Sequence, residues 1–223
     1  MVVKLFIFLV ASLFIFGSKA NRYNSRIYRP CRLSDFRCLR RYFADGSNCN
    51  PRVPNRLSSD YRITRMFFET PYFNGSNIDK NVVIRNQDNC YVSEFFVKKK
   101  SGATVLTVDC ANLGIESERT YIQHVSGRED TAYRYRTRAV YPLIRTTINF
   151  GSSLDLCSAS IYTELTQLPE FKVKPKSKSA ARKQLREESD MSIFEIESFV
   201  YRGRNLVSRF FDAFICRYNC EFA

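Results

Sequence analysis

Eight cysteines and one histidine are the residues of this sequence with the clearest potential for chemistry. An even number of cysteines is typical of disulfide bonds in a secreted chain. A zinc site is disfavoured, because the sequence has no Cys-x2-Cys pair and His124 is its only histidine. We therefore predict disulfides, no metal and no cofactor. The cysteines are Cys31, Cys38, Cys49, Cys90, Cys110, Cys157, Cys216 and Cys220.

Catalysis of the Ser-His-Asp type is disfavoured for a related reason. His124 is the only candidate imidazole base, and it falls in a predicted strand with no nucleophile motif nearby. The sequence has no glycine-rich phosphate loop and no carboxylate pair whose spacing indicates acid–base work. We predict that the protein is not an enzyme and that His124 is a hydrogen-bonded strand residue.

The N-terminus has the pattern of a secretory signal peptide. A short leading region, Val2 to Lys4, precedes an apolar run from Leu5 to Gly17, and Ser18-Lys19-Ala20 supplies the small residues of a cleavage site. The apolar run is about 13 residues long, which is too short to span a bilayer. We predict cleavage after Ala20, a secreted extracellular protein and no stable membrane anchoring.

The mature chain is basic, because loss of Lys4 and Lys19 lowers the formal charge only from +13 to +11. The charges are spread along the chain, so a solvated surface is favoured over binding of nucleic acid. Residues 172–190 carry many of them and are interpreted as an outer loop or solvated helix. Arg134, Arg136 and Arg138 alternate with tyrosines in one predicted strand, so they form either a solvated strand face or a surface for anionic glycans or a receptor.

From Tyr61 to Val173 the pattern is mostly β, with aromatic and β-branched runs between turn clusters. Long helical segments are missing between these runs, so we predict an antiparallel sheet. The predicted strands are 63–68, 82–85, 91–97, 104–110, 120–125, 131–140, 144–150, 161–165 and 171–174.

Two of these strands form a hairpin around Lys99-Lys100-Ser101-Gly102. If its centre lies near Lys100, Cys90 lies opposite Cys110, within the range of a disulfide. The same register places four apolar residues on the face of the two cysteines: Val92, Phe96, Leu106 and Val108.

The C-terminal segment, Arg204 to Phe222, has the periodicity of one amphipathic helix. Gly203 predicts a break before it, and Ser192 with Glu195 predicts the capping box of a shorter preceding helix. Cys216 and Cys220 fall on the polar side. The apolar stripe contains Leu206, Val207, Phe210, Phe211, Phe214, Ile215, Tyr218 and Phe222.

Nineteen Phe and thirteen Tyr, with no Trp, exceed what a solid core of this size requires. The excess favours an apolar pocket that binds a small hydrophobic ligand, although the same side chains would also fill a dry core. The candidate ligand-binding residues are Tyr133, Tyr135, Phe210, Phe211, Phe214, Ile215 and Tyr218. Asn74-Gly75-Ser76 is the one N-glycosylation sequon, so Asn74 is the predicted site of a glycan at a surface turn.

Residues 30–39 (PCRLSDFRCL), just after the signal, place six residues between Pro-Cys and Cys-Leu. This opening resembles that of the juvenile-hormone-binding and takeout-like secreted proteins of insect haemolymph. The hairpin segments 92–95 and 104–108, and the Asn112–Glu116 segment after them, are also similar to that family. The resemblance implies an α+β fold in which a strongly curved antiparallel β-sheet is wrapped around a long C-terminal α-helix. It also implies one lipid-binding-like domain over residues 21–223, after the signal over 1–20.

The resemblance implies a function and a disulfide map. The function would be a secreted, monomeric carrier of a terpenoid, fatty acid or similar lipid in an apolar tunnel. The alternative function is a basic interaction protein that binds glycans or a receptor through its arginine face. The map would join Cys31 to Cys38 and Cys157 to either Cys216 or Cys220, which leaves Cys49 for the other terminal cysteine.

Overall fold

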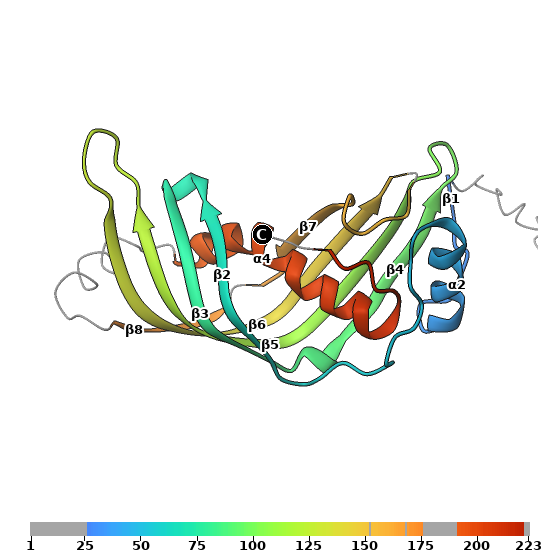
Figure 1. Ribbon diagram of the computed structural model, residues 1–223, viewed down its shortest axis with the longest axis horizontal. Helices are drawn as coiled ribbons and strands as arrows, with labels where there is room; N and C mark the ends of the chain where they lie inside the picture. The colour runs from blue at the N-terminus through green and yellow to red at the C-terminus, as the bar shows by residue number, and fades with distance from the viewer. Residues whose placement is uncertain (1–25, 152, 168, 176–190, 221–223) are drawn as a thin grey trace, which may run out of the picture.

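Antiparallel strands dominate the structure, a computed structural model that describes residues 26–151, 153–167, 169–175 and 191–220 (Figure 1). The predicted signal peptide and most of the basic stretch 172–190 lie outside these residues. In chain order the strands and helices are β1 (Ile27–Tyr28), α2 (Phe36–Gly46), β2 (Tyr61–Thr70), β3 (Gly75–Arg85), β4 (Cys90–Lys98), β5 (Thr104–Gln123), β6 (Thr131–Phe150), β7 (Ser160–Leu165), β8 (Glu170–Pro175) and α4 (Met191–Phe214). Short 3-10 turns at Pro71–Phe73 and Gln87–Asn89 lead into β3 and β4.

The hairpin of β5 and β6 forms the centre of the sheet. Each strand has 20 residues, and the two pair from Thr104↔Phe150 to Gln123↔Thr131. Each half of the hairpin has its own neighbours. β4 and β7 flank one half, and β3 and β8 flank the other. β1 and β2 complete the sheet at β4 and β3.

The prediction of two separate strands on each side of this hairpin is wrong. The pattern is interrupted near Asn112 and Pro142, but pairing resumes at Leu113↔Tyr141 beyond the irregularity. Proline lacks the N–H that a ladder needs. Pro142 is tolerated because the pairing of β6 with β8 ends at Val140 and its pairing with β7 begins at Ile144.

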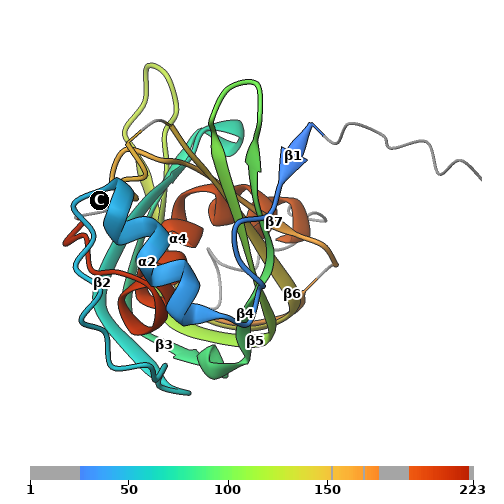
Figure 2. The ribbon, with the colours of Figure 1, turned by 90° about the vertical axis from the view of Figure 1, so that its right-hand side faces the viewer.

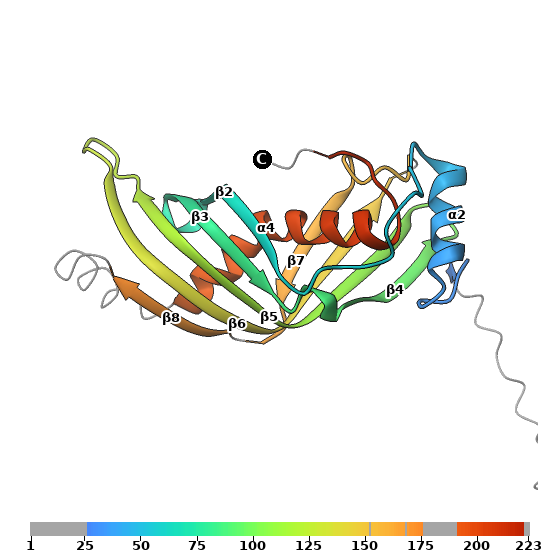
Figure 3. The same ribbon diagram turned by 60° about the horizontal axis from the view of Figure 1, so that its bottom comes forward.

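Helix α4 packs chiefly against β7 and β2 and crosses the concave side of the sheet (Figure 3). It runs through Gly203, so the predicted break at this residue is wrong. The absence of a side chain at Gly203 lets the helix approach Thr163 of β7 closely. The helix ends at Phe214, so the expected helix from Arg204 to Phe222 is wrong. The predicted fold class is corrected with it. The protein is mostly antiparallel sheet, with a C-terminal helix, α4, that crosses one side of it, and is not a sheet wrapped around a helix.

Disulfides link the N-terminal segment to α2, the C-terminal segment to two earlier loops, and β4 to β5. Helix α2 covers one end of the molecule (Figure 2), where the Cys38 N–H donates to Asp35 at the helix N-cap, at 3.0 Å. After a turn at Ile215, the described chain up to Cys220 is not helical, and Arg217 forms an isolated antiparallel bridge with Asn50. The four bridges are Cys31–Cys38, Cys90–Cys110, Cys157–Cys220 and Cys49–Cys216. Cys157 therefore pairs with Cys220 rather than with Cys216, and Cys216 pairs with Cys49.

The cysteine register of the β4–β5 hairpin is as predicted, with Cys90 directly opposite Cys110. The face beyond it differs, because a bulge falls between Val92 and Glu94. An extra residue reverses the alternation that follows it. Phe95 is therefore fully buried in the core, and Phe96 is only partly buried.

Candidate functional site

The residues predicted to line a ligand pocket do not form one site. Phe210, Phe211 and Ile215 belong to the main hydrophobic core, where each is at most 1% exposed. Tyr133 and Tyr135 instead pack in a separate small cluster with Tyr121 and Phe73.

Aromatic rings fill the space beneath the C-terminal half of α4. Phe43 of α2 lies 4.9 Å from Phe150 and 5.6 Å from Phe211, measured between ring centroids, and contacts them at tilted and edge-on angles. A void bordered by Val82, Ile115 and Phe199 measures only about 10 Å³. A space of this size holds at most about one water molecule. The packing at this helix therefore fits a dry core rather than a lipid tunnel.

Phe214 and Tyr218 lie at the margin of this core. Phe214 stacks on Phe36, with centroids 5.0 Å apart. The Tyr218 hydroxyl donates to the Leu154 carbonyl oxygen at 2.7 Å and lies 3.0 Å from the Ser47 hydroxyl. Burial raises the pKa of Tyr218 to about 12, so the hydroxyl stays neutral and holds the C-terminal segment to the loop before β7.

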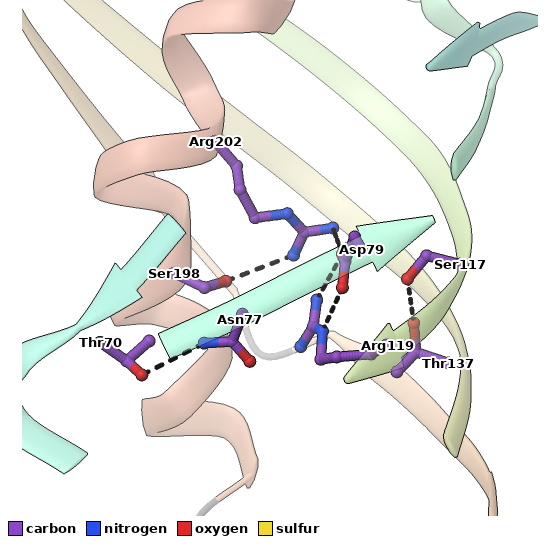
Figure 4. Close-up of polar contacts among 8 residues, drawn as sticks. All are labelled: Thr70, Asn77, Asp79, Ser117, Arg119, Thr137, Ser198 and Arg202. Atoms are coloured by element: carbon purple, nitrogen blue, oxygen red, sulfur yellow. Dashed lines mark hydrogen bonds and ion pairs between the residues drawn. The ribbon is translucent and has the colours of Figure 1, made fainter. Parts of the chain in front are cut away.

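A buried polar centre lies where α4 crosses β3 and β5 (Figure 4). Asp79 of β3 accepts hydrogen bonds from Arg119 Nε at 2.7 Å and Arg119 Nη2 at 3.0 Å. Arg202 of α4 approaches the same carboxylate, with 3.9 Å between Nη2 and Oδ2. The Phe68 ring lies under both guanidinium groups, 5.1 Å from that of Arg119 and 5.4 Å from that of Arg202.

Charge pairing sets the protonation of this centre. Burial alone would raise the pKa of Asp79, but the adjacent Arg119 guanidinium outweighs it, and Arg202 adds to the effect. The pKa of Asp79 is therefore held below its usual range. A carboxylate that stays ionised between two arginines is a poor proton donor or acceptor. The centre joins α4 to the sheet and has the features of a structural ion cluster.

Sequence reasoning missed this cluster for a clear reason. Charged residues in a strand are ordinarily assigned to the solvent face. A signal was nevertheless present, because Arg119 has the same alternation as Ile115 and Tyr121, which are buried apolar residues of β5. The periodicity of 2 therefore placed Arg119 on the inner face.

His124 has partners that the sequence did not reveal. Its Nδ1 lies 2.9 Å from Asp130 Oδ2, and its Nε2 lies 2.7 Å from the Ser76 hydroxyl. Its backbone carbonyl oxygen accepts a hydrogen bond from the Asn74 side chain at 2.6 Å. The sequence around His124 has no nucleophile motif, but Ser76 of β3 lies beside its ring. His124 is hydrogen-bonded as predicted, but it follows the end of β5, so its prediction as a strand residue is wrong.

This serine–histidine–aspartate arrangement has the contacts of a catalytic triad but not the setting. Ser76 is only 9% exposed, and it lies within β3, paired with Glu69 of β2 and Ile122 of β5. Its backbone groups are committed to the sheet, whereas acyl transfer requires free N–H donors beside the nucleophile. We interpret these contacts as structural, because they hold the β2–β3 turn against the β5–β6 loop.

The three arginines predicted on one face of β6 are exposed and alternate with the inward tyrosines, as expected. Two of them pair with glutamates directly opposite on β5. Arg136 lies 2.8 Å from Glu118, and Arg138 lies 3.3 Å from Glu116. A hollow of about 600 Å³ lies on this face. Its glutamates offset much of the basic charge that the proposal of glycan or receptor binding required.

Comparison with known proteins identifies close relatives. A family model described as Fibroin P25 matches residues 27–220. Fibrohexamerin from Galleria mellonella is 46% identical over 199 residues, which cover 88% of this chain and 91% of that protein.

These relatives overturn the juvenile-hormone-binding and takeout-like resemblance, the function as a lipid carrier in haemolymph, and the glycan or receptor alternative. The shared opening has a local cause. Asp35 caps the first turn of α2, and the Cys31–Cys38 bridge closes the short loop before it, so these ten residues form a local unit that by itself does not identify a family. The names of the relatives refer to fibroin and not to an enzyme. Within the described residues, no helix combines the length and the apolar character needed to cross a membrane.

Proposed function

The chain belongs to the Fibroin P25 family and is secreted, and from this premise we propose that it is a non-catalytic component that associates with fibroin chains in silk. The observation that carries the proposal is the 46% identity to fibrohexamerin, which extends over 91% of that protein. At this coverage the whole fold, rather than one motif, is common to both proteins.

The geometry supports a function on the surface rather than in the interior. The core beneath α4 is filled by aromatic rings, and four disulfides cross-link the chain, three of them in the segments outside the strands. Such a scaffold changes little in shape when it binds, so little conformational entropy is lost on association with a partner. The buried position of Ser76 supports the non-catalytic part of the proposal.

Co-elution with fibroin tests the proposal. Oxidised protein, without its signal peptide, is mixed with soluble fibroin extracted from silk glands and separated by size-exclusion chromatography in physiological salt. We expect the protein to shift into the fibroin fractions. A basic secreted protein of similar size and charge serves as the control for non-specific attraction and should elute alone. If this protein and the control protein elute in the same fractions, the proposed association is wrong.

A further inference from the structure

A second hollow lies between the segment that follows α2 and the C-terminal part of α4, with a volume of about 380 Å³. We call it the arginine hollow. The lining residues that matter here are Arg56, Tyr61, Gln87, Arg209, Asp212 and Arg217. It is separate from the polar centre at Asp79 and from the outer face of β5 and β6.

The walls of the arginine hollow are held in place by covalent and backbone contacts. The Cys49–Cys216 disulfide joins its two sides. Asn50 and Arg217 exchange two backbone hydrogen bonds, with N···O distances of 3.3 and 3.0 Å. The Asn55 N–H donates to the Ala213 carbonyl oxygen at 2.9 Å. The hollow is therefore a formed site and not a gap beside a loose loop.

Gln87 gives the hollow a buried donor. The residue is 1% exposed, and its backbone N–H donates to the Ser59 carbonyl oxygen at 3.0 Å. Its side-chain Nε2 is buried and makes no hydrogen bond within the described part of the chain. Buried amide donors are nearly always paired in folded proteins. Gln87 borders the hollow, so a small turn of its side chain would bring this donor to an acceptor bound there.

The charges around this donor favour an anionic acceptor. Arg209 is stacked on the Tyr61 ring, 3.5 Å from the ring centroid, which orients its guanidinium group. Among the described residues, Arg56, Arg209 and Arg217 form no ion pair within 4.0 Å. Asp212 is the one acidic residue that lines the hollow, so its walls carry an excess of positive charge.

We propose that the arginine hollow binds a side-chain carboxylate from an acidic segment of the partner polypeptide. A carboxylate has two oxygens in one plane, which accept hydrogen bonds from a guanidinium fork and leave capacity for an amide N–H. The volume suits one or two side chains rather than a folded domain. The identity of the polypeptide as fibroin rests on the proposed function, whereas the carboxylate chemistry rests on the hollow itself.

Fluorescence anisotropy with a labelled peptide tests the site directly. The probe is a blocked hexapeptide with alternating Glu and Gly, and its control has Gln in place of Glu. We expect the acidic peptide to bind and the Gln peptide to bind at least tenfold more weakly. Gln87→Leu and Arg217→Gln should each weaken binding of the acidic peptide by about tenfold or more, because each removes a hydrogen bond to a charged group. Arg128→Gln, an equal change of charge in the exposed β5–β6 loop, should leave binding unchanged.

A stability measurement separates binding from folding. Gln87→Leu removes a polar group that is unpaired in the free protein, so its melting temperature should equal or exceed that of the natural protein. If this variant does not fold, Arg56→Gln and Arg217→Gln provide the same comparison at exposed positions. Retained peptide binding in the folded hollow variants, or an equal loss in Arg128→Gln, would overturn the proposal.

Two further outcomes identify failures of different kinds. A heparin tetrasaccharide tests whether the hollow prefers sulfate. If it binds more tightly than the peptide, and its binding is lost in the same variants, the assignment of a carboxylate is overturned in favour of sulfate. If the acidic peptide binds but fibroin does not co-elute, the site is retained and the proposed function fails. If fibroin co-elutes equally with Gln87→Leu and the peptide does not bind, the hollow proposal fails and the function is retained.

Discussion

Asp79 and Arg119 form a two-point ion pair in the interior, with side chains that are 0% and 1% exposed. Removal of one member leaves an uncompensated charge that water cannot reach, which costs about 3–5 kcal/mol for a buried pair. We expect Asp79→Asn to lower the free energy of unfolding by about that amount, measured by urea denaturation with the disulfides intact.

The matched control is the pair of Asp109 and Arg145, which has the same two-point geometry at 2.9 and 2.7 Å. The Arg145 side chain is 41% exposed, so its charge can be hydrated after Asp109→Asn. The loss in this variant should be clearly smaller. Equal losses in the two variants would show that burial of the charge does not determine the cost.

The pH dependence of stability follows from the same pair. The pKa of Asp79 is depressed in the folded protein, because Arg119 and Arg202 outweigh the effect of burial. A depressed carboxyl pKa stabilises the fold above the unfolded pKa, about 3.9, and this contribution is lost as the pH falls toward the folded pKa. We expect the free energy of unfolding to fall more steeply from about pH 5 to about pH 2 in the natural protein than in Asp79→Asn. Parallel curves would contradict this assignment.

Gly203→Ala tests the close approach of α4 to β7. Alanine is favoured over glycine in a helix by about 1 kcal/mol. At this position, however, an added Cβ would lie 2.5 Å from the Thr163 Cβ and 2.6 Å from its Cγ2. Overpacking of this kind costs about 1–3 kcal/mol and opposes the gain in helix propensity. We therefore expect a lower melting temperature by calorimetry. Ser208→Ala in the same helix is the control and should show no such loss.

The disulfides should differ in their contribution to stability. Cys49–Cys216 spans 167 residues and Cys90–Cys110 spans 20. On the chain-entropy model, the longer loop stabilises the protein by roughly 2 kcal/mol more. We expect the double variant Cys49→Ser with Cys216→Ser to lose more stability to denaturant than Cys90→Ser with Cys110→Ser. The paired strands also keep Cys90 and Cys110 together when their bridge is absent. The reverse order would contradict the model.

Asn74 stays the predicted site of N-glycosylation. The residue is exposed in the turn between β2 and β3, with φ of 50°. Ser76 of the sequon is nearly buried by the His124 contact, so the glycan must be attached before this part of the chain folds. Protein secreted from insect cells should lose mass on treatment with an amidase that removes N-glycans. Asn74→Gln should abolish the shift. A shift that persists in this variant would place the glycan elsewhere.

Some features of this protein are determined by residues close together in the chain. The alternation of β6 placed its tyrosines inside and its arginines outside, because successive side chains of a strand point to opposite faces. The turn near Lys100 pairs β4 with β5 and brings Cys90 close to Cys110, because a hairpin joins its own two strands. The bulge after Val92 completes this register, since the pairing beside the turn, such as Val97↔Thr104, would otherwise place Cys90 opposite Ala111. Local chain geometry suffices for the alternation of β6 and for the pairing of β4 with β5, but not for the final register of the two cysteines.

Other features required the tertiary structure. The bulge after Val92 buries Phe95 in place of Phe96. This bulge depends on how β4 pairs with β5, so the sequence pattern of β4 alone does not predict it. Asp79, Arg119 and Arg202 come from three separate elements, and burial becomes favourable for them only when the charges meet. The same holds for the helix. Its apolar periodicity continues to Phe222, but the helix ends at Phe214, and the Cys49–Cys216 bridge and the Asn50–Arg217 pairing hold the next residues outside the helix. Whether the aromatic side chains enclosed a tunnel or filled a core was likewise decided by how their rings packed, because composition counts the rings but does not arrange them.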